Sequence, residues 1–355
     1  AELEGLIVTA EVTRPVPPPE PELDEKGQAR RAFLTAPTRL LRDAIGRPEQ
    51  KRPVETERVV VRRPLHTAVR YGVSQALLRA VALARGVAPA EVICQEWDLA
   101  PPEDPVPIHA QSGAARRRNA DKMIARRIAS LPHALIDDIP KQLGEKGEEL
   151  VRYVRWLKTR IRALGGADYR PTIHLDVHGA LGEASEENLG RVLGHLLSLE
   201  TAARPYRLRI ESPVIMESRA AQIEAVRTLR EYVEFRDMTV ELVVDEWANT
   251  LEDIQSFVDA GAGHMIQVKM PDLGSVHNAV EAVLACQTGG MGAFLGGSCA
   301  ETDLSARIAA HVALATRPAI VMAKPGMGVD EGIMIVQNEM GRALACIRSR
   351  LRGRP

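Results

Sequence analysis

The pattern of hydrophobic positions divides the chain at about residue 105. Before this point, residues 65–86 carry apolar side chains at three- to four-residue spacing and end at Gly86, which predicts a long helix. Prolines are dense over residues 14–26 and 99–107, which predicts a surface linker and a connector. Two shorter helices are predicted at residues 36–48 and 88–97.

After residue 105, short apolar runs alternate with amphipathic helical stretches. Helices are expected at residues 119–131, 146–164 and 186–202. Eight strands are expected at residues 106–111, 134–139, 171–177, 206–212, 239–247, 264–270, 292–298 and 319–326. This rhythm predicts a (β/α)8 TIM-type barrel over residues 106–355, ending in a C-terminal helix, behind a shortened N-terminal α+β capping domain at 1–105. A doubly wound open sheet shares the alternation, but polar residues at many strand ends favour the barrel.

Three acidic residues, Asp176, Glu211 and Asp245, close three successive apolar runs at intervals of 35 and 34 residues. Any one of them could simply end a strand or cap a helix. Because consecutive barrel strands bring their carboxyl ends to one rim, three together predict a site for Mg²⁺, which prefers carboxylate oxygens. Without a cation, three such charges would repel one another strongly.

A lysine ends the next apolar run. Alternation places Gln267 and Lys269 on one inward face, where a lysine is costly without a partner or a task. Near a divalent cation its pKa should fall, which would make the neutral amine available as a base. A Lys base beside Mg²⁺ is the pattern of enolase-type sites, which remove a proton next to a carboxylate.

Composition excludes several other classes of protein. The 355 residues carry a net charge of −1, so neither nucleic acid nor an anionic membrane is an expected partner. No apolar run reaches the length of about 18 residues needed for a membrane span, and no signal peptide is visible. None of the four cysteines forms a C-x-x-C pair, which argues against thiolate zinc and disulfides and favours the cytoplasm.

Several long segments resemble one family, the methylaspartate ammonia-lyases of the enolase superfamily. They occur in the family's order and comprise LHTAVRYGVSQALL, AQSG, LPHALIDD, HLDVHG, LRIESP, DEWANT, GHMIQVKMPDLG, GGSCAET and AKPGMGVDEGIMIVQNEM. The resemblance implies a Mg²⁺-dependent enzyme that eliminates ammonia from (2S,3S)-3-methylaspartate, a small amino acid, to give mesaconate. It also implies activation by K⁺ and a homodimer.

The resemblance assigns roles to individual residues. Lys269 matches the base that takes the C3 proton, and His133 matches the opposing base that serves the other C3 epimer. The Mg²⁺ ligands match Asp176, Glu211 and Asp245, and the substrate-binding positions match Gln111, Gln267, Ser298 and Cys299.

The chain departs from the family's pattern at several positions. The family has Phe at His109, Tyr at Phe294 and at His178, Leu at Met322, Thr at Ser298, and an acidic loop at residues 116–118, where this chain has three arginines. Two other interpretations therefore stay open: another enolase-superfamily reaction, such as racemisation or dehydration, and a non-catalytic homologue.

Overall fold

The computed structural model describes residues 7–15, 56–298, 301–323 and 326–352. The chain divides into two compact units, Ala1–Leu65 and His66–Pro355. The described part of the first unit is an antiparallel pair, β1 (Ile7–Pro15) and β2 (Thr56–Pro64). The expected domain boundary after residue 105 stays a prediction.

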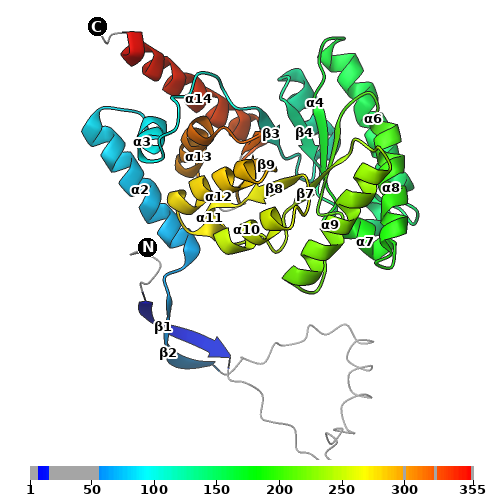
Figure 1. Cartoon of the computed structure of the whole chain (residues 1–355), viewed down its shortest axis with the longest axis horizontal. Helices are drawn as coiled ribbons and strands as arrows, with labels where there is room; N and C mark the ends of the chain where they lie inside the picture. The colour runs from blue at the N-terminus through cyan, green and yellow to red at the C-terminus, as the bar shows by residue number, and fades with distance from the viewer. Residues whose placement is uncertain (1–6, 16–55, 299–300, 324–325, 353–355) are drawn as a thin grey trace, which may run out of the picture. The chain divides into compact units, whose positions relative to one another are not determined.

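The second unit contains a closed barrel of parallel strands, as the sequence predicts (Figure 1). Strand β10 pairs with β3 and closes the ring, in the order β10-β3-β4-β5-β6-β7-β8-β9. The strands are β3 (Ile108–Ala110), β4 (Ser130–His133), β5 (Thr172–Asp176), β6 (Leu208–Glu211), β7 (Glu241–Val244), β8 (Met265–Val268), β9 (Gly292–Leu295) and β10 (Ile320–Ala323).

Helices connect the strands and surround them (Figure 1). They are α4 (Arg116–Ala125), α5 (Ile139–Gln142), α6 (Glu148–Gly165), α7 (Ala180–Ala184), α8 (Leu189–Ala203), α9 (Arg219–Phe235), α10 (Leu251–Asp259), α11 (Met270–Leu273), α12 (Val276–Thr288), α13 (Asp303–Thr316) and α14 (Val329–Arg352). Side chains at the residue before the helix satisfy the first backbone N–H groups of several of them, for example Ser218 on α9 and Thr250 on α10. Within the described residues, none of the helices combines the length and apolarity required to cross a membrane.

Two helices precede the barrel strands and belong to the same compact unit. Helix α2 (Thr67–Arg85) ends at Gly86, whose left-handed backbone (φ 64°) donates its N–H back into the last turn, as predicted. Helix α3 (Pro89–Glu96) follows and packs against α13. The segment before β3 contains no regular element, which confirms the proline-rich connector.

Three sequence predictions differ from the structure. Residues 134–139 were expected to form the second barrel strand, but β4 lies earlier, at Ser130–His133. His133, the last residue of β4, and Ala134 adopt left-handed backbones (φ 63° and 53°), so the strand does not continue into residues 134–139. The apolar residue Ile136, which favoured a strand in the sequence, is buried in a loop, and its N–H donates to the Asp176 carbonyl.

The other two differences concern element ends. The helix expected at 119–131 begins at Arg116 and stops at Ala125, because the chain must enter β4 at Ser130. Strand β1 includes Arg14 and Pro15, the start of the proline-rich stretch expected to be a loop; proline is tolerated at such an edge position. Residues 16–26 and the expected helix 36–48 lie outside the described residues.

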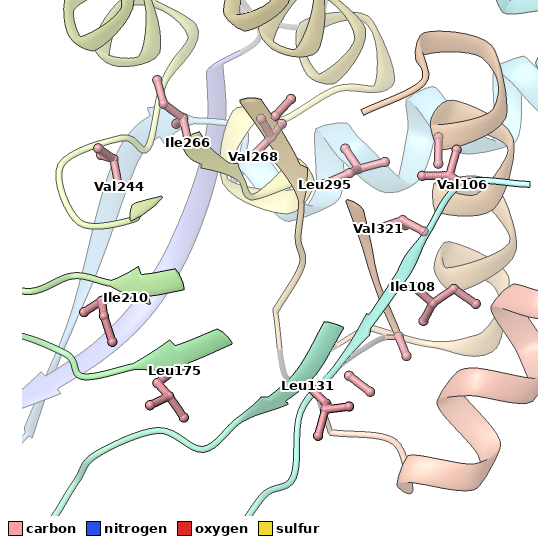
Figure 2. Close-up of a cluster of buried hydrophobic side chains, with 14 of the residues drawn as sticks. Val106, Ile108, Leu131, Leu175, Ile210, Val244, Ile266, Val268, Leu295 and Val321 are labelled. Carbon is pink, nitrogen blue, oxygen red and sulfur yellow. The ribbon is translucent and has the colours of Figure 1, made fainter. Parts of the chain in front are cut away.

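Alternation along the strands builds two cores. Along β7, Val244 belongs to the large cluster shared with the helices, whereas Val243 faces the barrel interior. Figure 2 shows members of the large cluster on successive strands, among them Ile108, Leu131, Leu175, Ile210, Val244, Ile266, Leu295 and Val321. The interior cluster contains Val243, Met265, Phe294, Ile320 and Met322.

The barrel interior is divided into an apolar side and a polar side. The apolar cluster comes from β7 to β10. Strands β3 to β6 contribute buried polar groups, namely His109, Ser130, His174, Arg209 and Glu211, and Gln267 of β8 lies beside them. Burying polar groups costs free energy unless each finds a partner. The polar side is therefore where a function is expected.

A buried acidic residue joins the C-terminal helix to the barrel. Glu339 of α14 is 2% exposed and accepts hydrogen bonds from Arg307 (3.0 Å) and Arg342, and its Oε1 lies 2.9 Å from His311 Nε2. Burial raises the pKa of Glu339, but the hydrogen bonds from His311 and Arg342 outweigh it and lower the pKa to about 2. Because the pKa is depressed in the folded protein, the ionised carboxylate stabilises the fold. This stabilisation is complete at pH values above the ordinary pKa of a glutamate and is lost as the pH falls through the lowered pKa.

We expect Glu339→Gln to lower the free energy of unfolding at neutral pH by about 1.5–3 kcal/mol, the value of hydrogen bonds to a charged group. The loss should shrink as the pH falls from about 4.5 toward about 2, where the wild-type carboxylate becomes protonated. Denaturant unfolding followed by circular dichroism measures both. Glu231→Gln, in an exposed ion pair of α9, is the control and should change stability by less than about 0.5 kcal/mol. Equal effects of the two substitutions would contradict the assignment.

Candidate active site

The three predicted carboxylates meet at the carboxyl ends of adjacent strands. Asp176 and Glu211 are the last residues of β5 and β6 and lie opposite each other in register, and Asp245 directly follows β7. Their exposed fractions are 5%, 0% and 7%. The sequence prediction that these side chains share one rim of a barrel agrees with this placement.

Burial and mutual repulsion disturb all three carboxyl groups. Burial, reinforced by the charges of Asp245 and Glu246, raises the pKa of Asp176 to about 8. Burial and the same acidic neighbours raise the pKa of Glu211 well above its usual range. Burial also raises the pKa of Asp245, and the charge of Lys269 limits the rise to about 6. The cluster therefore needs a counter-charge, and its hard oxygen donors fit Mg²⁺.

Lys269 supplies part of that counter-charge. It directly follows β8 and stands at the N-cap of α11, with its Nζ 2.6 Å from Asp245 Oδ1. Burial lowers the pKa of Lys269, but the charge and hydrogen bond of Asp245 outweigh this, so the pKa is raised. The expectation that a divalent cation lowers the pKa of Lys269 stays a prediction.

Glu211 is held from two sides. The Gln267 amide donates to Glu211 Oε1 at 2.6 Å, and His174 Nε2 lies 2.7 Å from Glu211 Oε2. All three side chains are buried. Gln267 therefore points inward, as alternation predicts, and fixes the orientation of a carboxylate.

His133 lies beside the carboxylates because the backbone turns at the end of β4. Alternation would place it with Leu131 on the helix-facing side, but its left-handed backbone (φ 63°) directs the imidazole inward. Its Nε2 lies 3.4 Å from Asp176 Oδ2, and its Nδ1 lies 3.7 Å from Glu211 Oε2. Burial and the charge of Lys269 lower the pKa of His133 to about 3, so the imidazole is neutral at neutral pH.

The topology sets the two nitrogen groups against each other. His133 comes from β4 and Lys269 from the end of β8, which are four places apart in the ring of eight strands. Strands at this separation lie on opposite sides of a barrel. The carboxylates on β5, β6 and β7 occupy the arc between them, so a molecule bound there is flanked by two possible bases.

A second group of polar residues lies at the rim. His178 Nδ1 lies 2.9 Å from Glu246 Oε1, and the Ser212 hydroxyl donates to the other oxygen of Glu246. His178 also contacts the site directly, because its backbone N–H donates to Asp176 Oδ1 at 3.0 Å. The carboxylate of Glu246 adds to the negative charge felt by Asp176.

Gln111 and Ser298, two of the remaining predicted residues, follow the carboxyl ends of strands. Gln111 follows β3 and lines a cavity of about 280 Å³ between that strand end and the start of α14. Ser298 follows β9, and its backbone N–H donates to Glu301 at 3.0 Å. Cys299 lies outside the described residues, so its predicted role stays a prediction.

Two buried histidines were not assigned to the site from the sequence. His174 lies two residues before Asp176 on the same inward face of β5, and alternation alone could have identified it. The His109 ring lies against it, with ring centroids 4.4 Å apart. Both are fully buried, and burial lowers the pKa of each well below the usual range.

Comparison with known proteins assigns the chain to a family. Residues 101–349 match the family model for the methylaspartate ammonia-lyase C-terminus, and residues 43–98 match the model for the N-terminus. The chain belongs to the methylaspartate ammonia-lyase family. It is 52% identical over 296 residues to methylaspartate ammonia-lyase 2 of Carboxydothermus hydrogenoformans, covering 83% of this chain and 71% of that relative.

Two crystal structures of family members superimpose closely. One is the Mg complex of β-methylaspartase from Clostridium tetanomorphum, with a TM-score of 0.78 and 48% identity over 81% of this chain and 70% of that one. The other is the methylaspartate ammonia-lyase of Citrobacter amalonaticus containing (2S,3S)-3-methylaspartic acid, with a TM-score of 0.79, 47% identity and the same coverage. The family resemblance and the barrel fold predicted from the sequence are both confirmed.

The raised pKa of Asp176 predicts how Mg²⁺ stabilisation depends on pH. A carboxyl whose pKa is higher in the folded protein than in the unfolded chain stabilises the fold while protonated, and this contribution is lost as the pH rises toward about 8. A cation that binds only the folded protein would restore it. We therefore expect MgCl₂ to raise the melting temperature more at about pH 8 than at about pH 6.

Differential scanning fluorimetry measures this shift. Asp245→Asn, which removes one carboxylate, should reduce it, whereas Asp259→Asn, on the exposed face of α10, should not. A shift of the same size at both pH values, or one that is unaffected by Asp245→Asn, would contradict the predicted metal site.

Proposed function

We propose that this protein is a Mg²⁺-dependent ammonia-lyase that eliminates ammonia from (2S,3S)-3-methylaspartate and gives mesaconate, reversibly. Membership of the methylaspartate ammonia-lyase family carries the proposal. The arrangement of three buried carboxylates between Lys269 and His133 supports it. The same pair of bases would serve a racemase or a dehydratase, but the family match favours the lyase.

The chemistry follows from the residues at the strand ends. Asp176, Glu211 and Asp245 would hold Mg²⁺, which stabilises the negative charge that develops on a substrate carboxylate when the neighbouring carbon loses its proton. Gln267 and His174 keep Glu211 in a fixed orientation. A cation at Asp245 would also weaken the attraction that keeps Lys269 protonated.

The two bases divide the work by stereochemistry. Lys269 takes the proton from C3 of the (2S,3S) substrate, and the bond to the nitrogen at C2 breaks as the double bond forms. His133, on the opposite side of the ring of strands, takes the proton from the other C3 epimer.

Substrate-binding roles go to Gln111, Gln267, Ser298 and Cys299, following the family pattern. The apolar side of the barrel interior supports a further assignment. Phe294 and Met322 depart from the family's Tyr and Leu and belong to the buried interior cluster, so they would face the alkyl group of the substrate. A change of one methylene in such a wall shifts discrimination by about 1–3 kcal/mol.

Three further features rest on the family resemblance alone. We propose that K⁺ activates the enzyme, that it works as a homodimer and that it acts in the cytoplasm. Activity in KCl against NaCl, and the molar mass in solution, test the first two.

The assignment of Lys269 is tested by turnover. With 3-methylaspartate and Mg²⁺, the wild type should produce the ultraviolet absorbance of a conjugated diacid. Lys269→Ala should lower kcat by at least about 10²–10⁴-fold, the usual contribution of a general base. The exposed Lys146→Ala serves as control and should retain activity. A fully active Lys269→Ala variant would remove Lys269 from the base role.

The assignment of His133 is tested by comparing the two epimers. His133→Gln should lower turnover of the (2S,3R) epimer by about 10²–10⁴-fold. Turnover of the (2S,3S) epimer should fall much less, because Lys269 serves it. Parallel losses for both epimers would mean that His133 does not act as a separate base.

A further inference from the structure

Three histidines meet on the polar side of the barrel interior. They are His109 of β3, His133 of β4 and His174 of β5, with exposed fractions of 0%, 4% and 0%. One ring nitrogen of each lies within 4.8 Å of one ring nitrogen of both others. Such a group is distinct from the three carboxylates in its donor atoms, since imidazole nitrogen is a softer ligand than carboxylate oxygen.

In each ring, one nitrogen already faces an oxygen. His109 Nδ1 lies 3.0 Å from Ser130 Oγ, His174 Nε2 lies 2.7 Å from Glu211 Oε2, and His133 Nε2 lies 3.4 Å from Asp176 Oδ2. In metal sites, histidine ligands regularly bond their second nitrogen to a carboxylate or another oxygen, which fixes the ring and its tautomer. His109 and His174 therefore have the outer hydrogen bond of a metal ligand, and His133 has a carboxylate within 3.4 Å.

Two of the remaining nitrogens lie at the spacing of ligands to one ion. His109 Nε2 and His133 Nδ1 lie 3.5 Å apart. Two nitrogens bound to one tetrahedral Zn²⁺ at 2.0–2.1 Å are separated by about 3.4 Å. The third candidate, His174 Nδ1, is buried and makes no hydrogen bond within the described residues. A buried nitrogen without a partner is costly, and a metal ion would satisfy it.

The charges around the three rings favour a cation. Asp176 and Glu211, the carboxylates that contact His133 and His174, place negative charge beside the rings, which a second ion would share with Mg²⁺. His133 Nδ1 also lies 3.7 Å from Glu211 Oε2. Two cations oppose this. Arg209 lowers the pKa of His109 and of His174, but its guanidinium is paired with Glu241 at 2.5 Å. Lys269 lowers the pKa of His133, but its amine is paired with Asp245 at 2.6 Å.

We propose that His109, His133 and His174 form a second metal site, which takes a divalent ion that prefers imidazole, with Zn²⁺ as the representative. The site adjoins the carboxylates and shares none of the three predicted Mg²⁺ ligands as a direct ligand. One consequence rests on the proposed function. Zn²⁺ bound to His133 occupies the lone pair that would accept the substrate proton, and it therefore inhibits the enzyme.

Binding is tested first, without reference to activity. Chelator-treated protein in excess Mg²⁺ is titrated with Zn²⁺ by calorimetry, and with Co²⁺ while the visible absorption of tetrahedral cobalt is recorded. The wild type should bind one Zn²⁺ per chain. His109→Phe should weaken binding at least 10–100-fold, the loss seen when even an outer contact of a metal site is removed. The exposed His277→Gln, on α12, is the matched control and should bind as the wild type does.

Two results would overturn the site. One is the absence of Zn²⁺ binding in the wild type when Mg²⁺ is in excess. The other is unchanged binding by His109→Phe, because Zn²⁺ would then use the neighbouring group of His133, Asp176 and Glu211, whose ligand atoms also lie within 4.8 Å of one another. His109→Gln, which can still bond Ser130 but lacks an imidazole, answers the question if His109→Phe fails to fold.

Inhibition is tested second, with Mg²⁺ saturating. Zn²⁺ should inhibit the wild type, and any residual activity of His109→Phe should be insensitive to the same Zn²⁺ concentration. Zn²⁺ bound without inhibition would overturn the inhibitory consequence and leave the site intact. If the wild type shows no turnover of 3-methylaspartate, the proposed function fails, whereas the binding titrations still decide the metal site.

Discussion

The interaction on which the site depends is the burial of Glu211. This carboxylate is completely buried at the end of β6, between strands that end in two further carboxylates. An isolated buried charge is very costly, so its surroundings must either neutralise it or bond it. Gln267 and His174 bond its two oxygens, and Lys269 on the next strand but one faces Asp245. The polar side of the barrel is organised around this requirement.

The barrel makes this arrangement possible because parallel strands deliver their carboxyl ends to one rim. The hydrophobic residues of each strand pack toward the helices, so alternate positions are free to carry polar groups inward. Phe294 and the other members of the interior cluster fill the remaining side of the barrel without taking part in the hydrogen bonds. Stability and chemistry therefore rest on different faces of the same strands.

Much of this could be predicted from the sequence. The strand ends at Asp176, Glu211 and Asp245 follow from apolar runs that stop at an acid, and Gln267 follows from alternation.

What could not be predicted depends on backbone turns and on contacts between distant strands. Because His133 and Ala134 have left-handed backbones, the second strand ends at His133 and lies earlier in the chain than predicted. The pairing of Lys269 with Asp245, which raises the pKa of the amine, has no signal in the local sequence either, because local sequence does not reveal which neighbour an amine meets. The contact between His109 and His174 joins residues 65 positions apart and has no local signal.

The split interior has a consequence for how such an enzyme can diversify. Residues such as Phe294 and Met322 come from β9 and β10, whereas the charged groups come from β5 to β8. Substitutions in the apolar cluster can therefore change the space next to a side group of the ligand, while the charges around the residues that transfer protons stay the same. The fold separates the evolution of selectivity from that of reactivity, except at His109, a buried ionisable ring that contacts Phe294 of the apolar side.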